Sequence, residues 1–177
     1  IQADVEGKGA AAALTMVQLA TETQAGVEVS PSPAELVTRL NRRMNTNWIT
    51  FAAMYLDPES HRIELANAGH ELPLLRHVDG SVEELTDIRG TPLSVLEGEV
   101  YQQESRQLLS GELLVLFSDG FPDAEQARTE TRFGKPRLIE LLAGFDTQAG
   151  DFSQLAARAV DEFREESEQF DDMCMLC

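Results

Sequence analysis

Four aspartates stand where predicted strands begin or end, and they are the residues of this sequence best placed to do chemistry. Asp4 ends a short first segment, Asp119 follows the apolar run 113–117, and Asp171 and Asp172 precede the last apolar run. A carboxylate at the end of a buried strand is costly to desolvate unless it is paired or binds a cation. Carboxylate oxygens suit hard cations such as Mg²⁺ and Mn²⁺. Strand ends that meet in space would form such a site, although Asp is also an ordinary turn residue.

Two other patterns carry weaker signals. The segment Gly7-Lys8-Gly9 opens a predicted helix, and a helix N-terminus favours anions. The nucleotide-binding loop pattern GxxxxGK[ST] is absent, however. His70 closes the turn Asn67-Ala68-Gly69-His70 and could be a base, a ligand or a turn residue, and we favour the turn role. The GxSxG pattern of a serine nucleophile is also absent.

The two cysteines form a lone CxxC pair, Cys174 and Cys177. A structural zinc site needs a second pair of ligands, and three scattered histidines do not supply it. We therefore expect both cysteines to be small apolar residues of a buried strand. Scarce cysteine without a disulfide framework is typical of the reducing cytoplasm, which is the expected location.

The charge of the chain excludes several classes of partner. Thirty-one acidic and 14 basic residues give a net charge of −17, which repels nucleic acid and an anionic membrane surface. The longest strongly apolar run, 113–117, is far shorter than the ~20 residues of a membrane span. A phosphorylated substrate would need local positive charge, for which metal ions are the obvious source.

The pattern of elements predicts an α+β domain. A length of 177 residues fits one domain. Ser32, Pro33 and Glu35 form a capping box that starts a helix. Helices are predicted at 9–23, 33–44, 135–143 and 152–164, and strands at 48–56, 62–65, 72–78, 81–85, 100–108, 112–117 and 173–177. Two helices, several antiparallel strands, further helices and a last strand indicate helices layered on stacked sheets.

Six segments, in order and across nearly the whole chain, resemble the SpoIIE/RsbU-type branch of the metal-dependent type 2C (PPM) serine/threonine protein phosphatases. These segments are ADVEGKG at 3–9, TFAAMYLDPESHRIELANAGHELPLL at 50–75, GTPLSVL at 90–96, GELLVLFSDGFPDA at 111–124, RFGKPRL at 132–138 and DDM at 171–173. The resemblance implies two stacked antiparallel β-sheets flanked by helices, the PPM-type α-β-β-α sandwich. It implies a single phosphatase domain over 1–177, expected to lack its first strands and to stop near the end of its last.

The resemblance also implies a centre of two Mn²⁺ or Mg²⁺ ions that activates a water to attack phosphoserine or phosphothreonine. The catalytic metal ligands it assigns are Asp4, the Val5 backbone carbonyl, Asp119 and Asp171. The supporting residues it assigns are Gly7, Gly9, Asp123 and Asp172, while Asn67, Gly69 and His70 are expected to shape a turn. Relatives carry a further aspartate upstream of Asp4, and often serine where this chain has Glu6.

The function implied by the resemblance is a bacterial phosphatase that acts on a phosphorylated STAS-type (anti-anti-sigma) regulatory protein. A sensor or receiver domain is expected upstream in the parent chain. The alternative is a pseudophosphatase of the same fold that binds a regulatory protein without turnover. An unrelated α+β domain whose matches are turn residues is a third possibility, in which the carboxylates would not converge.

Overall fold

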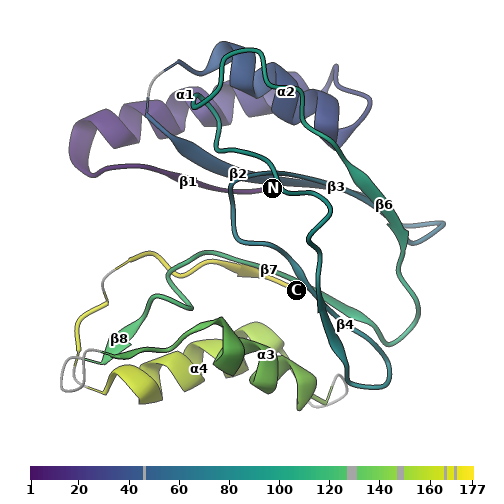
Figure 1. Cartoon of the computed structure of the whole chain (residues 1–177), viewed down its shortest axis with the longest axis vertical. Helices are drawn as coiled ribbons and strands as arrows, with labels where there is room; N and C mark the ends of the chain where they lie inside the picture. The colour runs from purple at the N-terminus through teal and green to yellow at the C-terminus, as the bar shows by residue number, and fades with distance from the viewer. Residues whose placement is uncertain (46, 127–130, 147–149, 166, 170) are drawn as a thin grey trace. The chain divides into compact units, whose positions relative to one another are not determined.

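The computed structural model describes residues 1–45, 47–126, 131–146, 150–165, 167–169 and 171–177. The chain forms two compact units, each with its own sheet, helices and apolar core (Figure 1). The N-terminal unit comprises Ile1–His70 and Thr86–Leu108, and the C-terminal unit comprises Glu71–Leu85 and Leu109–Cys177. The single domain over 1–177 stays a prediction.

The N-terminal unit is built on a four-stranded antiparallel sheet in the order β1-β2-β3-β6. Its strands are β1 (Gln2–Val5), β2 (Ile49–Asp57), β3 (Arg62–Ala68) and β6 (Glu104–Gln107). The β2–β3 hairpin is confirmed at the predicted place. Strand β6 is shorter than the predicted 100–108, because only four of those residues pair with β3.

Helices α1 (Gly9–Val27) and α2 (Pro33–Arg43) lie over one face of this sheet (Figure 1). The Ser32 side chain accepts a hydrogen bond from the Glu35 backbone N–H at 3.3 Å, which confirms the predicted start of α2. Leu36, Val37 and Leu40 of α2 are buried in the core of this unit. Helix α2 is therefore the main apolar cover of strands β2 and β3.

The spacing of Leu14, Met16, Val17, Leu19 and Ala20 predicts the apolar side of α1, and of these residues Leu19 alone is buried. Three of its residues are 71%, 55% and 59% exposed: Leu14, Met16 and Val17. The buried residues of the helix are Thr15, Leu19 and Gly26. A Cβ at position 26 would lie 2.6 Å from Leu36 Cδ1, so a glycine lets α1 approach α2 closely. The buried side of α1 combines Leu19 with the smaller Thr15 and Gly26, which a pattern of large apolar residues does not reveal.

The C-terminal unit is built on a second antiparallel sheet, in the order β10-β7-β4-β5. Its strands are β4 (Leu74–Arg76), β5 (Val82–Glu84), β7 (Leu113–Phe117) and β10 (Met175–Leu176). Strands β8 (Glu125–Gln126) and β9 (Thr131–Arg132) form a separate two-stranded ribbon. Of the strands predicted at 72–78 and 81–85, β4 and β5 form an antiparallel hairpin that turns at Asp79-Gly80, with Gly80 at φ +87°.

Helices α3 (Lys135–Ala143) and α4 (Phe152–Arg164) begin and end where the sequence predicts. They share an apolar core with β4 and β7 that includes Phe117, Leu138 and Val160. Asp151 caps α4 by accepting a hydrogen bond from the Ser153 backbone N–H at 2.8 Å. No helix among the described residues is both long enough and apolar enough to cross a membrane.

The predicted burial of the two cysteines is wrong. Neither Cys174 nor Cys177 forms a disulfide bond, and both residues are exposed. Only Met175 and Leu176 pair with β7, and β10 is the edge strand of its sheet. The flanking cysteines therefore lie outside the paired part of the strand.

The Ser32 cap gives a direct test of the N-terminal unit. Replacing Ser32 by alanine removes the acceptor for the Glu35 N–H and is expected to lower the free energy of unfolding by about 1 kcal/mol. Ser110→Ala, at an exposed turn position, is the matched control and should change it by less than about 0.5 kcal/mol. Urea unfolding of both variants measures the difference, and equal effects would contradict the capping role.

Candidate metal centre

Strands β7 and β10 place two of the candidate ligands on neighbouring segments of the C-terminal unit. Phe117 lies opposite Met175, and Leu116 lies opposite Leu176. Because the strands are antiparallel, the residues that follow β7 lie beside those that precede β10. Asp119 therefore belongs to a segment that runs next to the segment of Asp171 and Asp172.

The Ser118 side chain ties these two segments together. Its hydroxyl donates to the Asp172 carbonyl oxygen at 2.8 Å and accepts from the Cys174 N–H at 2.9 Å. The Ser118 N–H donates to the Cys174 carbonyl oxygen at 2.9 Å. We call this set of three bonds the Ser118 bridge. Ser118 is only 7% exposed, so the bridge is shielded from competing water.

Gly120 lets the two segments approach closely. A Cβ at this position would lie under 3.0 Å from the backbone carbonyl oxygen of Asp172, a distance that real Cβ atoms essentially never show. Any larger residue would push Asp172 away from the end of β7. A glycine is thus required after Asp119, because no side chain fits between the two segments.

Asp171 and Asp123 line one small hollow of the C-terminal unit. Its walls are Gly120, Asp123, Ala124, Arg164, Gln169, Asp171 and Met173. The Asp123 N–H donates to the Asp119 carbonyl oxygen at 2.8 Å, and the Asp123 carboxylate pairs with Arg132 Nη1 at 2.9 Å. The Asp171 carboxylate accepts from the Asp172 N–H at 2.8 Å. Asp123 is therefore fixed to the turn that follows Asp119.

Asp4 and Val5 belong to the N-terminal unit, at the end of β1. Asp4 is exposed and lies opposite Thr50 of β2. The next residue, Glu6, is held by its N–H, which donates to the Trp48 carbonyl oxygen at 3.0 Å. Its own carbonyl oxygen accepts from Asn47 Nδ2 at 2.8 Å. The chain is thus well fixed directly after the two candidate ligands.

Gly7 and Gly9 turn the chain from β1 into α1. Their φ angles are +100° and +78°, which residues with a side chain adopt only with strain. A Cβ at Gly9 would meet nothing within 4 Å. The positive φ angles make both glycines favourable for the backbone conformation of this turn, and their supporting role at the site stays a prediction.

The Asn67–His70 turn contacts strand β2, because His70 lies within hydrogen-bond distance of Thr50. Asn67 Oδ1 accepts from the His70 N–H at 2.9 Å, and Asn67 Nδ2 donates to the His70 carbonyl oxygen at 3.1 Å. His70 Nδ1 is 2.8 Å from Thr50 Oγ1, and the histidine is 7% exposed. Burial lowers the pKa of His70 to about 4, so the imidazole is neutral at pH 7. These contacts support the turn role expected for Asn67 and His70.

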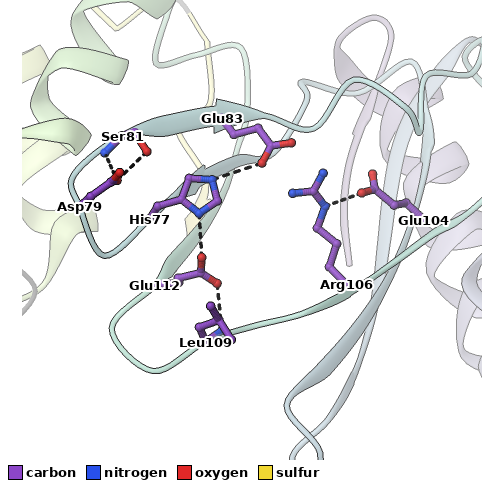
Figure 2. Close-up of polar contacts among 8 residues, drawn as sticks. All are labelled: His77, Asp79, Ser81, Glu83, Glu104, Arg106, Leu109 and Glu112. Carbon is purple, nitrogen blue, oxygen red and sulfur yellow. Dashed lines mark hydrogen bonds and ion pairs between the residues drawn. The ribbon is translucent and has the colours of Figure 1, made fainter.

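A further polar group of the C-terminal unit was not foreseen from the sequence. Figure 2 shows His77 between two carboxylates, with Nδ1 at 2.7 Å from Glu112 and Nε2 at 3.3 Å from Glu83. The Glu112 hydrogen bond, and then that to Glu83, raise the pKa of His77. The other Glu112 oxygen accepts from the Leu109 N–H at 2.9 Å, so the group joins the β4–β5 hairpin to the turn before β7.

The donors assigned from the sequence are compatible with a hard cation. Asp4, Asp119 and Asp171 offer oxygen atoms only, which suits Mg²⁺ or Mn²⁺. Asp4 lies in one unit, and the other two lie in the other unit. Among the described residues of either unit, no three His, Cys, Asp or Glu side chains form a group that could hold a metal ion. The metal ligands therefore stay a prediction.

Comparison with known proteins settles the family. The model of the family described as Stage II sporulation protein E (SpoIIE) matches residues 1–177. The chain belongs to the SpoIIE family. It is 30% identical over 146 residues to the phosphoserine phosphatase RsbU of Bacillus subtilis, covering 79% of this chain and 43% of RsbU. This SpoIIE-family chain thus spans less than half the length of the curated relatives that it matches.

Solved structures of SpoIIE-like phosphatase domains share the fold. The SiaA-PP2C domain of Pseudomonas aeruginosa has a TM-score of 0.84 at 20% identity, covering 98% of this chain and 72% of that one. RsbX in complex with magnesium has a TM-score of 0.71 at 15% identity, covering 98% and 76%. These likenesses confirm the predicted α+β class, with two antiparallel sheets and flanking helices.

The Gly120 contact predicts a steric effect. Gly120→Ala is expected to lower the free energy of unfolding by about 1–3 kcal/mol, because its methyl group overlaps the Asp172 carbonyl. Gly144→Ala is the matched control, since Gly144 has helical φ and ψ and its nearest atom is 3.6 Å away. Thermal unfolding of both variants distinguishes them, and an unchanged Tm for Gly120→Ala would contradict the packing.

The neutral His70 predicts a pH dependence of stability. Its pKa falls from 6.5 to about 4 on folding, so the unfolded state binds more protons between these values. The stabilisation is complete above pH 6.5 and is lost as the pH falls towards 4, by roughly 2 kcal/mol at pH 5. Urea unfolding at pH 7.5 and pH 5 should show that His70→Gln flattens this dependence. The same slope in both proteins would overturn the assignment.

Proposed function

We propose that this chain is a metal-dependent serine/threonine protein phosphatase domain. The observation that supports the proposal is the β7–β10 pairing, which brings the segment of Asp119 and Gly120 beside the segment of Asp171 and Asp172, with Gly120 close to the Asp172 carbonyl. Membership of the SpoIIE family supports it, as does similarity to a relative named phosphoserine phosphatase. The proposed reaction is hydrolysis of a phosphoserine or phosphothreonine on a partner protein.

We infer that Asp4, the Val5 carbonyl, Asp119 and Asp171 would hold two Mn²⁺ or Mg²⁺ ions. This assignment rests on the family resemblance, and all four groups would supply oxygen atoms, which suit these hard cations. Divalent cations, when bound, lower the pKa of water and neutralise phosphoryl charge. The solved magnesium complex of RsbX supports this class of ion.

Ser118, Asp123 and Asp172 would position the candidate ligands and would not contact the substrate. The Ser118 bridge fixes the backbone of Asp172 and Cys174, and through it the position of Asp171. Asp123 would steady the Asp119 turn, with its own charge offset by Arg132. Asp172 would support the site through its backbone carbonyl oxygen, which accepts the hydrogen bond of the Ser118 hydroxyl.

The charge balance of the chain supports a need for cations. A net charge of −17 repels a phosphorylated protein at long range. Bound cations would reverse that field locally. We propose a STAS-type protein carrying phosphoserine as the partner, with a sensor or receiver domain upstream in the parent chain. Both assignments rest on the family resemblance.

One residue favours a second candidate function. Glu6 adds a carboxylate two residues from Asp4, where relatives often carry serine. This extra charge would compete with an incoming phosphate or change metal binding. If it blocks turnover, the chain would act as a pseudophosphatase that binds a regulatory protein.

The phosphatase proposal predicts metal-dependent hydrolysis of an aryl phosphate. Mn²⁺ should support turnover by the wild-type chain, and Asp119→Asn should reduce it below detection because one ligand oxygen is lost. Asp87→Asn, an exposed carboxylate of the other unit, removes the same charge and should keep full activity.

The outcomes separate the two functions. Full activity in Asp119→Asn would refute the ligand assignment. A wild-type chain that is silent with Mn²⁺ and with Mg²⁺, but that gains turnover in Glu6→Ser, would identify Glu6 as the cause of a pseudophosphatase state. Circular dichroism of each variant establishes that the fold is kept.

A further inference from the structure

An open groove of about 500 Å³ lies along helix α2 in the N-terminal unit. One wall is the basic face of α2, formed by Arg39, Arg42 and Arg43. The opposite wall is the segment of Val100 and Tyr101 that precedes β6. Three of the 14 basic residues of a strongly acidic chain therefore line a single groove.

Two of these arginines have no partner among the residues that the structure describes. Arg43 lies 3.8 Å from Glu22, but neither Arg39 nor Arg42 makes a hydrogen bond or ion pair there. Arg39 Nε is also buried without a hydrogen-bond partner. A buried guanidinium N–H that is left unsatisfied is costly, and native proteins seldom retain one without a reason.

The three arginines repel one another, although Arg42 and Arg43 lie in the last turn of α2, where the helix dipole favours positive charge. Positions 39, 42 and 43 are spaced by three and four residues, so like charges stand on one face of α2 and repel. The chain carries 31 acidic residues that could have paired with them, yet only Glu35 joins the lining of the groove. Glu35 in the lining and Glu22 beside Arg43 offset two of the three guanidinium charges, so the groove keeps a net positive charge within a negative molecule. Such a local field attracts an anionic ligand to this place.

We propose that this groove binds an acidic peptide segment of a partner protein. Arginine presents a planar fork of donors that matches a carboxylate in a bidentate pair. The groove is also flanked by apolar surface, since Val29 and Val100 are 63% and 60% exposed. Carboxylates with neighbouring apolar side chains would satisfy both features. The site is independent of the proposed metal ligands and of turnover.

Other anions fit the groove less well. Tyr101 is only 4% exposed, so its ring offers no face on which a nucleobase could stack. A long nucleic acid would meet the net charge of −17 beyond the groove. A short peptide places its charge at the arginines alone.

The test is fluorescence polarisation of a labelled short peptide of alternating glutamate and leucine, with the glutamine counterpart as the neutral probe. The glutamate peptide is expected to bind the wild-type chain, and the neutral one is not. Arg39→Gln and Arg42→Gln are each expected to weaken binding by roughly three- to tenfold. Arg158→Gln, an exposed arginine of α4 in the other unit, removes the same charge and should leave binding unchanged.

Three results would overturn the proposal. Equal binding of both peptides would show that the arginines do not recognise the carboxylates of the peptide. An equal loss in Arg158→Gln would show that only net charge matters. Binding of ATP in place of the peptide, with the same dependence on Arg39 and Arg42, would assign the groove to a nucleotide. The Tm of each variant, expected to match the wild type, excludes loss of the fold.

Discussion

The pairing of β10 with β7 is the interaction on which the candidate site depends. Only two residue pairs form this ladder, Met175 with Phe117 and Leu176 with Leu116. So short an edge strand contributes little by itself, and the Ser118 bridge extends the contact towards the aspartates. Gly120 completes it by allowing close approach of the Asp172 carbonyl. The placement of the candidate ligands in the C-terminal unit therefore depends on the Ser118 hydroxyl group and on the absence of a side chain at Gly120.

The N-terminal unit fixes its candidate ligands by a different device. Asp4 stands on a paired strand, and the backbone beyond it is held by Trp48 and Asn47 before two positive-φ glycines turn the chain into α1. The helices of this unit have unequal roles. Helix α2 buries its apolar face in the core, whereas α1 leaves large apolar residues exposed. The same α2 also carries Arg39 and Arg42, which have no partner among the residues that the structure describes, so one helix serves both the core and the basic groove.

Local signals made much of the fold predictable. The Ser32-Pro33 start of α2 and the bounds of α3 and α4 follow from caps, glycines and helical periodicity, which act within a few residues. The buried face of α1 could not be predicted, because it depends on Gly26 meeting Leu36 of another helix. The exposure of Cys174 and Cys177 likewise depends on where pairing with β7 ends. For the site, the strand-end aspartates could be named from their positions. The Ser118 bridge and the His70–Thr50 contact could not, because both join segments far apart in the chain.

The central claim is that Asp119 and Asp171 act together on one cation. A double-mutant cycle of Mn²⁺ binding by isothermal titration calorimetry tests it most directly, with Asp119→Asn, Asp171→Asn and the double variant. Each single change should weaken Mn²⁺ binding, and the two losses should differ from additivity by more than about 0.5 kcal/mol. Strictly additive losses, or an unchanged affinity in either single variant, would contradict the account.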